Sequence, residues 1–133
     1  MQPEDEIVLN TVKNCGYTHT LAFLILQQAK VESANFTSHV FRENRNAFGY
    51  KFYKGALLQI APSTVSPEKD FYAKYRSLED SVREIIFWLR RRDRERKLII
   101  SDLTSEIKYA TALKSCGFFG GTAEAYAKAM KVY

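Results

Sequence analysis

The feature that most constrains the fold is a predicted helix over residues 18–33 that carries a carboxylate on its apolar side. Apolar residues recur there at three- and four-residue spacing, which is typical of a helix that faces a core: Ala22, Ile25, Leu26 and Ala29. Glu32 occupies the next position on this stripe. Burial and the negative end of the helix dipole both raise the pKa of a carboxyl group, which favours an acid that donates a proton near neutral pH. If the helix is rotated slightly, Glu32 is instead a solvated residue of the last turn.

The segments after this helix contain a series of short motifs. Residues 27–38 are QQAKVESANFTS, residues 41–51 are FRENRNAFGYK, and residues 71–82 are FYAKYRSLEDSV. This series resembles the glucosaminidase domains of peptidoglycan hydrolases, whose motifs run A-Q-A-x-x-E-S-x-x-x-x-S, N-N-x-F-G-x-K and F-R-x-Y-x-S-x-x-E-S. Residues 117–126 are similar to the family's G-Y-A-T-D-x-x-Y-like segment. Lytic transglycosylases also carry E-S after a helix but usually continue with G-L-M-Q, whereas residues 46–49 here are NAFG.

This resemblance implies a mainly helical (α+β), lysozyme-like fold with a small, shortened β-hairpin lobe. We expect residues 1–133 to form a single domain of this kind. The resemblance further implies a glycoside hydrolase that cleaves the β-1,4 bond between GlcNAc and MurNAc in peptidoglycan glycan strands, with Glu32 as the general acid. The candidate substrate contacts that it implies are Asn46, Tyr50, Tyr75 and Tyr126.

Glycoside hydrolysis usually needs a second carboxylate as base or nucleophile, and the sequence leaves its identity open. The family often has an acid in the β-lobe shortly before the F-R-x-Y-like segment, but residues 59–61 contain none. The nearest acids are Glu68 and Asp70, with Glu43 on the near side, and Glu84 matches another family carboxylate on the fourth helix. Three hypotheses follow: one of these residues is a displaced base, the substrate's N-acetyl group replaces the nucleophile, or the domain no longer cleaves. The last would make it a non-catalytic saccharide-binding or phage virion-assembly module.

The charge of the chain suits an acidic polymer. The formal net charge of +5 fits either a cell wall rich in carboxylates and phosphates or nucleic acid. Residues 90–97, RRRDRERK, are the strongest nucleic-acid signal. These residues follow an amphipathic helix, and no aromatic residues are interleaved among them. Asp93 and Glu95 can also pair with neighbouring arginines. We therefore predict a solvated helix end and no nucleic-acid partner.

Aromatic residues are concentrated close to the predicted acid in sequence. Residues 48–75 contain seven of them, a composition that suits a saccharide groove because sugar rings lie with their apolar faces against aromatic side chains; six of the seven are Phe48, Tyr50, Phe52, Tyr53, Tyr72 and Tyr75. About half of such rings are expected in the core, and we assign Phe36, Phe41, Phe87 and Trp88 there. Phe48 is predicted to be a structural plug before Gly49.

The remaining pattern predicts further helices and one hairpin. Helices are expected over residues 4–14, from a Ser38 cap through residue 43, from a Ser77 cap, from Thr104 or Ser105 through residue 115, and over residues 122–132. A small hairpin is expected over residues 50–60, turning at Lys54-Gly55, with residues 61–70 as a loop.

No metal or cofactor is expected, because the two cysteines and two histidines have no metal-binding spacing. Cys15 and Cys116 are either buried thiols or a disulfide. The longest apolar run, residues 21–26, is too short to insert into a membrane, and the first six residues do not have the pattern of a secretory signal. Since peptidoglycan is extracytoplasmic, we expect a periplasmic or cell-wall protein or a phage virion component, present as a mature form, a fragment or part of a larger assembly.

Overall fold

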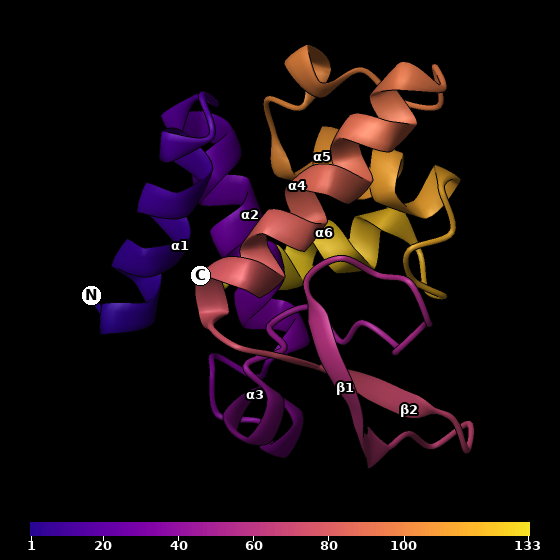
Figure 1. Cartoon of the computed structure of the whole chain (residues 1–133). Coiled ribbons are helices and arrows are strands. Elements are labelled where there is room, and N and C mark those ends of the chain that lie inside the picture. The colour runs from indigo at the N-terminus through magenta and orange to yellow at the C-terminus, as the bar shows by residue number, and fades with distance from the viewer.

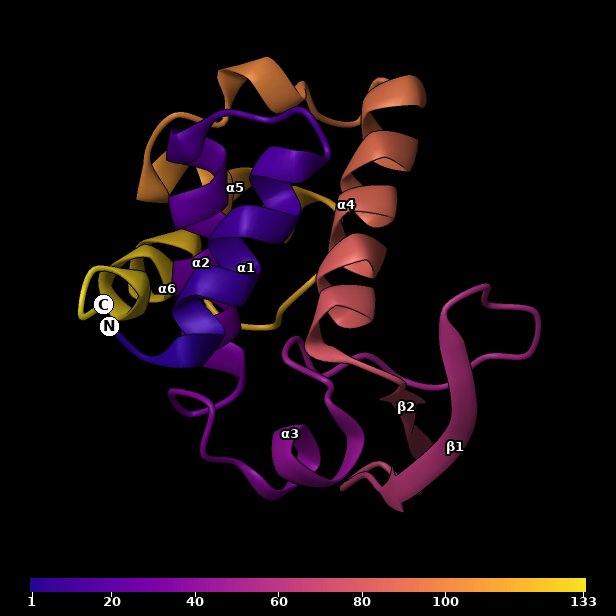
Figure 2. The ribbon, with the colours of Figure 1, turned by 60° about the vertical axis from the view of Figure 1, so that its left-hand side comes forward.

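The computed structural model describes residues 1–133 and contains six α-helices, a short 3-10 helix and a two-stranded sheet (Figure 1). Apart from α3, the helices lie together in one body, and the sheet lies with α3 at one end of it (Figure 2). The elements in chain order are α1 (Pro3–Asn14), α2 (His19–Glu32), α3 (His39–Asn44), β1 (Gln59–Val65), β2 (Phe71–Tyr75), α4 (Leu78–Arg94), η1 (Ile100–Asp102), α5 (Glu106–Ser115) and α6 (Ala123–Met130). The mainly helical, lysozyme-like expectation is confirmed.

Side-chain caps begin most of these helices, as the sequence predicts. The side-chain oxygens that accept a backbone N–H from the first turn belong to Thr18, Ser38, Ser77, Ser105 and Thr122. Gly16 and Gly117 follow the ends of α1 and α5 with φ angles of +93° and +79°, a conformation that favours glycine. Local sequence chemistry therefore fixes the helix boundaries.

Helix α2 lies at the centre of the helical body. Its residue Ile25 is fully buried, together with Val8 and Val12 of α1 and Ile85 of α4. Two buried glutamines of α2 also form polar links to the last two helices. The hydroxyl of Tyr109 in α5 donates to Gln28 Oε1 at 2.5 Å, and Gln27 Nε2 donates to the carbonyl of Met130 in α6 at 3.2 Å. Apolar burial and these hydrogen bonds together fix where the C-terminal end of α2 lies.

The hairpin prediction was wrong in position. Strands β1 and β2 pair antiparallel with Gln59 opposite Tyr75 and Val65 opposite Phe71, so the first half of the predicted loop over residues 61–70 is strand. Residues 50–52 lie along the other side of β2, where the Phe52 N–H donates to the Phe71 carbonyl at 2.8 Å. The predicted turn at Lys54-Gly55 exists but does not join two paired strands. Pro62 is tolerated in β1 because β1 is an edge strand, where a missing N–H removes no hydrogen bond on the outer side.

Most of the aromatic side chains assigned to the core are buried. Phe36, Phe41 and Phe48 are buried as predicted, but Phe87 is 43% exposed and Trp88 is only partly buried, so the core assignment of Phe87 was wrong.

Cys15 and Cys116 are both free thiols. None of the helices has the length and apolarity needed to cross a bilayer.

Candidate active site

Glu32 is the last residue of α2 and is half-buried. The Tyr126 hydroxyl of α6 donates a hydrogen bond to Glu32 Oε2 at 3.1 Å. Burial raises the pKa of Glu32 above its ordinary value, while the hydrogen bond from Tyr126 opposes this in part. The structure therefore gives Glu32 the properties of a carboxyl group that stays protonated to higher pH than an exposed glutamate.

Ser33 organises the backbone immediately after Glu32. Its buried hydroxyl donates to the Ala29 carbonyl at 2.6 Å and accepts the Phe36 N–H at 2.8 Å. Residues 34–36 all have left-handed backbone conformations, with φ between 52° and 63°, which is rare for consecutive non-glycine residues. The bond from Phe36 to Ser33 and the burial of the Phe36 ring hold this turn, so Ser33 stabilises the loop that follows the acid.

Glu84 is the second half-buried carboxylate near the predicted site. It lies on α4, and its Oε2 atom accepts hydrogen bonds from the Tyr75 hydroxyl and, at 3.2 Å, from Gln59 Nε2. Burial raises the pKa of Glu84, and the hydrogen bond from Gln59 lowers it in part. Tyr75 is only 1% exposed, so its side chain orients Glu84 and does not form a wall open to a ligand.

The other acids predicted from the sequence lie in a different environment. Glu68 and Asp70 are exposed at the turn between β1 and β2, where both pair with Lys51 at 3.1 and 3.3 Å. The hydrogen bond from Lys51 lowers the pKa of Glu68, and the hydrogen bond from Ser66 followed by that from Lys51 lowers the pKa of Asp70. Glu43 is exposed on α3. Of these four candidates, only Glu84 combines partial burial with a raised pKa.

The Asn46 amide is committed to the protein backbone. Its Nδ2 atom donates to the carbonyls of Tyr50 at 2.8 Å and Ala73 at 3.0 Å, and its Oδ1 atom accepts the N–H groups of Phe48 and Tyr50. The side chain is 1% exposed. All of its donors and its acceptor are used, so the structure gives Asn46 a positioning role and leaves it no free group for a substrate.

Two groups of aromatic rings involve the helix that carries Glu84 and the hydrogen-bond partner of Glu32. The Phe118 ring lies edge-on against both Trp88 and Tyr50, with centroids 5.3 and 6.0 Å apart. The next residue, Phe119, stacks on Tyr126 at 4.1 Å with the rings inclined by 13°, and Tyr126 in turn bonds Glu32. Residues 118–119 were not singled out from the sequence as site residues, although they fall within the 117–126 segment that carries the resemblance.

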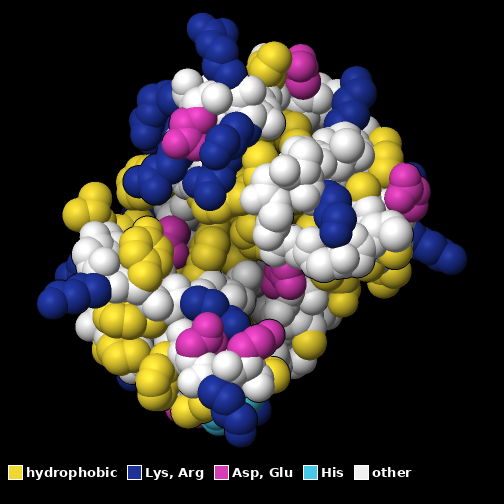
Figure 3. Space-filling model, turned by 90° about the vertical axis from the view of Figure 1, so that its right-hand side faces the viewer, with side chains coloured by type: hydrophobic (Ala, Val, Ile, Leu, Met, Phe, Trp, Pro, Cys, Tyr) yellow, Lys and Arg dark blue, Asp and Glu magenta, His cyan; other side chains and the backbone are white.

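A cavity of about 690 Å³ opens beside Tyr50, Glu84 and Trp88. Figure 3 shows a hollow on this side of the molecule, with hydrophobic side chains on its floor and Lys and Arg side chains clustered near one end. Its lining also includes arginines of the 90–94 segment, which sequence reasoning had assigned to a solvated helix end. Glu32 is not among the residues that line this cavity.

The buried hydroxyl of Tyr50 has no hydrogen-bond partner in the chain. Burial and the nearby charge of Glu84 both raise the pKa of Tyr50, so this hydroxyl stays protonated and able to donate. Tyr50 is therefore the predicted substrate contact whose hydroxyl has no partner within the chain, but this hydroxyl is closed off from solvent. The Tyr126 hydroxyl, by contrast, is already bonded to Glu32.

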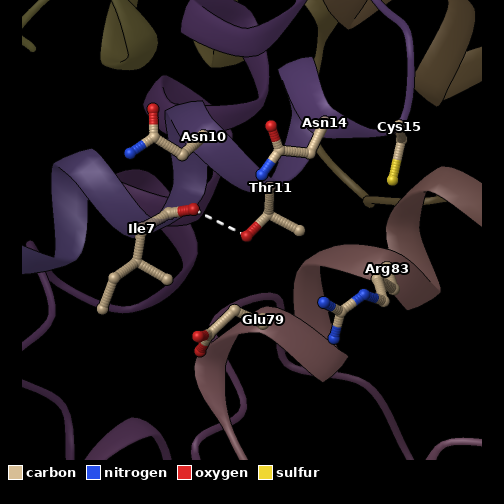
Figure 4. Close-up of a pocket in the computed structure, with 7 residues that line it drawn as sticks. All are labelled: Ile7, Asn10, Thr11, Asn14, Cys15, Glu79 and Arg83. Carbon is tan, nitrogen blue, oxygen red and sulfur yellow. Dashed lines mark hydrogen bonds between the residues drawn. The ribbon is translucent and has the colours of Figure 1, made fainter.

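A second cavity, of about 390 Å³, lies between α1 and α4 (Figure 4). It is lined by Ile7, Asn10, Thr11, Asn14, Cys15, Glu79 and Arg83. None of these side chains is aromatic, so the cavity offers no ring against which a sugar could lie. No cluster of three or more His, Cys, Asp or Glu side chains suited to a metal ion is found in the structure.

Comparison with known proteins gives one family match and one similar structure. A family model named glucosaminidase, described as mannosyl-glycoprotein endo-beta-N-acetylglucosaminidase, matches residues 11–132. A solved chain from a type VI secretion system effector–immunity complex of Pseudomonas protegens is similar in fold, with a TM-score of 0.63 and 19% identity over 96% of this chain and 83% of that chain. A comparison with curated proteins found no match.

Replacing Asn46 tests its positioning role. Asn46→Ala should lower the free energy of unfolding by at least about 2 kcal/mol, because several buried backbone groups lose their partner. Denaturant unfolding measures this directly. Asn10→Ala, at an exposed position of α1, is the matched control and should change stability by less than about 0.5 kcal/mol. Equal effects of the two substitutions would contradict the role assigned to Asn46.

The raised pKa of Glu32 predicts a pH dependence of stability. The folded chain holds the Glu32 proton more tightly than the unfolded chain, whose pKa is near the ordinary 4.5. The free energy of unfolding should therefore fall as the pH rises from that value through the raised folded pKa. Glu32→Gln removes this loss, while Glu84 contributes equally to both proteins. Unfolding curves measured at a series of pH values should diverge in this direction, and parallel pH profiles would show that Glu32 titrates normally.

Proposed function

The chain belongs to the glucosaminidase family, and from this premise we propose that it is a peptidoglycan hydrolase of the endo-β-N-acetylglucosaminidase type. The bond it cleaves is the β-1,4 linkage from GlcNAc to MurNAc. The observation that carries the proposal is the half-buried Glu32 at the end of α2, with its raised pKa and its hydrogen bond from Tyr126. Glycan strands of peptidoglycan are the partner, and the chemistry needs no cofactor.

Glu32 is the general acid in this proposal. Burial raises the pKa of its carboxyl group, and Tyr126 occupies Oε2, which leaves Oε1 free to carry a proton towards the glycosidic oxygen. The stacking of Phe119 on Tyr126 restricts the tyrosine ring and thereby the orientation of the acid. Proton transfer to the leaving oxygen breaks the bond to the anomeric carbon of GlcNAc.

Glu84 is the second carboxylate in this proposal. Tyr75 and Gln59 both donate to its Oε2 atom, so Oε1 remains free to activate water or to attack the sugar. Carboxyl groups about 5–5.5 Å apart retain the anomeric configuration, whereas groups roughly 6.5–9.5 Å apart invert it. Tyr50 lines the cavity together with Glu84 and is the predicted contact that a bound sugar would meet there.

The proposed substrate sets the place of action. Peptidoglycan lies outside the cytoplasm, so we place the activity in the periplasm, in the cell wall or on a phage virion. The similar solved chain comes from a complex of a type VI secretion effector with its immunity protein, which supports delivery to such a compartment.

Glu32→Gln should abolish turnover while leaving the fold and saccharide binding nearly intact. Glutamine has almost the same shape but cannot supply a proton, and general acid catalysis contributes about 10²- to 10⁴-fold. The melting temperature should stay the same or rise slightly, since a neutral amide costs less to bury than a charge. The measurements are release of reducing ends, the melting temperature and pull-down on insoluble peptidoglycan.

Glu6→Gln, at an exposed position of α1, is the matched control and should keep full activity. Mass spectrometry of the native protein's products identifies the reaction. New reducing-end GlcNAc supports the proposal, and 1,6-anhydro-MurNAc would indicate a transglycosylase instead. An absence of product would favour the non-catalytic saccharide-binding or virion-assembly module.

Glu84→Gln tests the second carboxylate separately. If Glu84 is the base or nucleophile, the rate should fall about as far as for Glu32→Gln, because glutamine can neither accept a proton nor attack the sugar. A rate close to that of the native protein would exclude Glu84 from the chemistry. The substrate's own N-acetyl group would then be the nucleophile to examine.

A further inference from the structure

One face of α4 lines the larger cavity well beyond Glu84. Its residues recur at helical spacing and all line the larger cavity: Glu84, Phe87, Trp88, Arg91 and Arg92, with Arg94 beside them. At a rise of about 1.5 Å per residue, Arg91 lies roughly 10 Å along the helix axis from Glu84. The arginines are therefore too far along the helix to act on the bond whose cleavage Glu84 would assist. They nevertheless line the same cavity as Glu84.

Arg91, Arg92 and Arg94 have no acidic partner in the protein. None of them is within 4.0 Å of a carboxylate. The neighbouring acids, which the sequence suggested would pair with them, are used elsewhere. Asp93 accepts the Ile100 N–H at 2.9 Å, and Glu95 pairs with Lys97 at 3.6 Å.

Arg90 shows what a structural arginine looks like in the same segment. Its Nε atom donates to the Tyr17 hydroxyl at 2.8 Å, and its guanidinium also donates to the Cys15 carbonyl at 3.3 Å. Arg90 therefore links α4 to the loop between α1 and α2. Arg91, Arg92 and Arg94 make no such bonds, so their positive charge remains available at the cavity.

The aromatic residues of the cavity hold one of these arginines in place. The Arg92 guanidinium lies 4.3 Å from the centroid of the Trp88 ring, in a cation–π contact. The Trp88 ring is itself fixed edge-on by Phe118 at 5.3 Å. Because this stacking restricts the guanidinium, less conformational entropy is lost when it binds a ligand.

We propose that Arg91, Arg92 and Arg94 form a subsite for a carboxylate carried by the glycan. This inference rests on the proposed function, because it names the substituent that the substrate bears beside the cleaved bond. A guanidinium matches a carboxylate in shape and binds it through two parallel hydrogen bonds. In peptidoglycan the carboxylate has two sources: the lactyl group of a MurNAc without a peptide, and the peptide itself where one is attached, because the peptide is joined to the lactyl carboxyl as an amide. A neutral polymer of GlcNAc has neither.

The experiment compares binding of three probes to the chain carrying Glu32→Gln, so that no probe is consumed. The probes are a chitin oligosaccharide, peptidoglycan strands stripped of peptide by an amidase, and strands that retain their peptides. Replacing Arg91, Arg92 and Arg94 by glutamine should weaken binding of a carboxylate-bearing probe by about tenfold. Binding of the chitin oligosaccharide should not change. Raising the salt concentration should reduce the difference.

A matched control removes the same charge elsewhere. Lys13, Arg42 and Lys108 are exposed, do not line the cavity and form no ion pair, so replacing them by glutamine should leave all three affinities unchanged. An equal loss in this control would show that overall charge is responsible and would overturn the subsite. Melting temperatures are measured for both triple variants and for the single variants Arg91→Gln and Arg94→Gln. Melting temperatures that match that of the parent chain exclude a loss of fold as the cause of weaker binding.

The pattern across the probes identifies the carboxylate. A loss for stripped strands assigns the lactyl group, and a loss only for peptide-bearing strands assigns the peptide. Three outcomes overturn the proposal. The chain binds none of the probes, or the arginine variant binds all three probes as before, or the arginine variant loses chitin binding as much as it loses binding of the other probes. A native chain that cleaves no peptidoglycan refutes the proposed activity, but the binding comparison still decides the subsite.

Discussion

The side-chain amide of Asn46 is the interaction on which the arrangement of the site depends. It joins the loop after α3 to the Ala73 carbonyl of β2 and closes the turn that presents Tyr50. Two residues after Ala73 on the same strand, Tyr75 bonds Glu84. One buried amide therefore fixes the loop after α3 against β2, and with it both the Tyr50 ring and the strand whose Tyr75 orients Glu84. In a lobe of only two strands, few other interactions could do this.

The pKa values of the side-chain carboxyl groups shift in opposite directions because their surroundings differ. Glu68 and Asp70 lie in water beside Lys51, and their hydrogen bonds favour the ionised form. Glu32 and Glu84 are half-buried without a cationic partner, and desolvation favours the neutral form. The sequence made all four candidates, Glu32 and Glu84 by their match to family positions and Glu68 and Asp70 by their nearness to the expected one, but only their surroundings separate them.

The sequence predicts local structure well and long-range packing less well. Helix boundaries follow from caps such as Thr18 and Ser77, whose bonds lie within one turn, and the position of Glu32 follows from the stripe of α2. The hairpin was misplaced because strand pairing over residues 59–75 depends on partners far apart in sequence, and because Pro62 counts against a strand unless the strand is known to be an edge. The role of Asn46 and the free arginines of α4 depend on which groups meet in space, which no spacing rule supplies.

The open side of β1 has a consequence for how copies of this chain meet. An exposed strand edge is a template for pairing with another molecule, and β1 carries the exposed apolar residues Ile60 and Val65. Pro62 removes one N–H from that edge, and irregular pairing between Gln59 and Ala61 and between Ser63 and Val65 bends it. The proline that misleads a sequence-based assignment of the strand thus protects the lobe against edge-to-edge aggregation, allowing a short sheet to remain uncovered beside a cleft that must stay open.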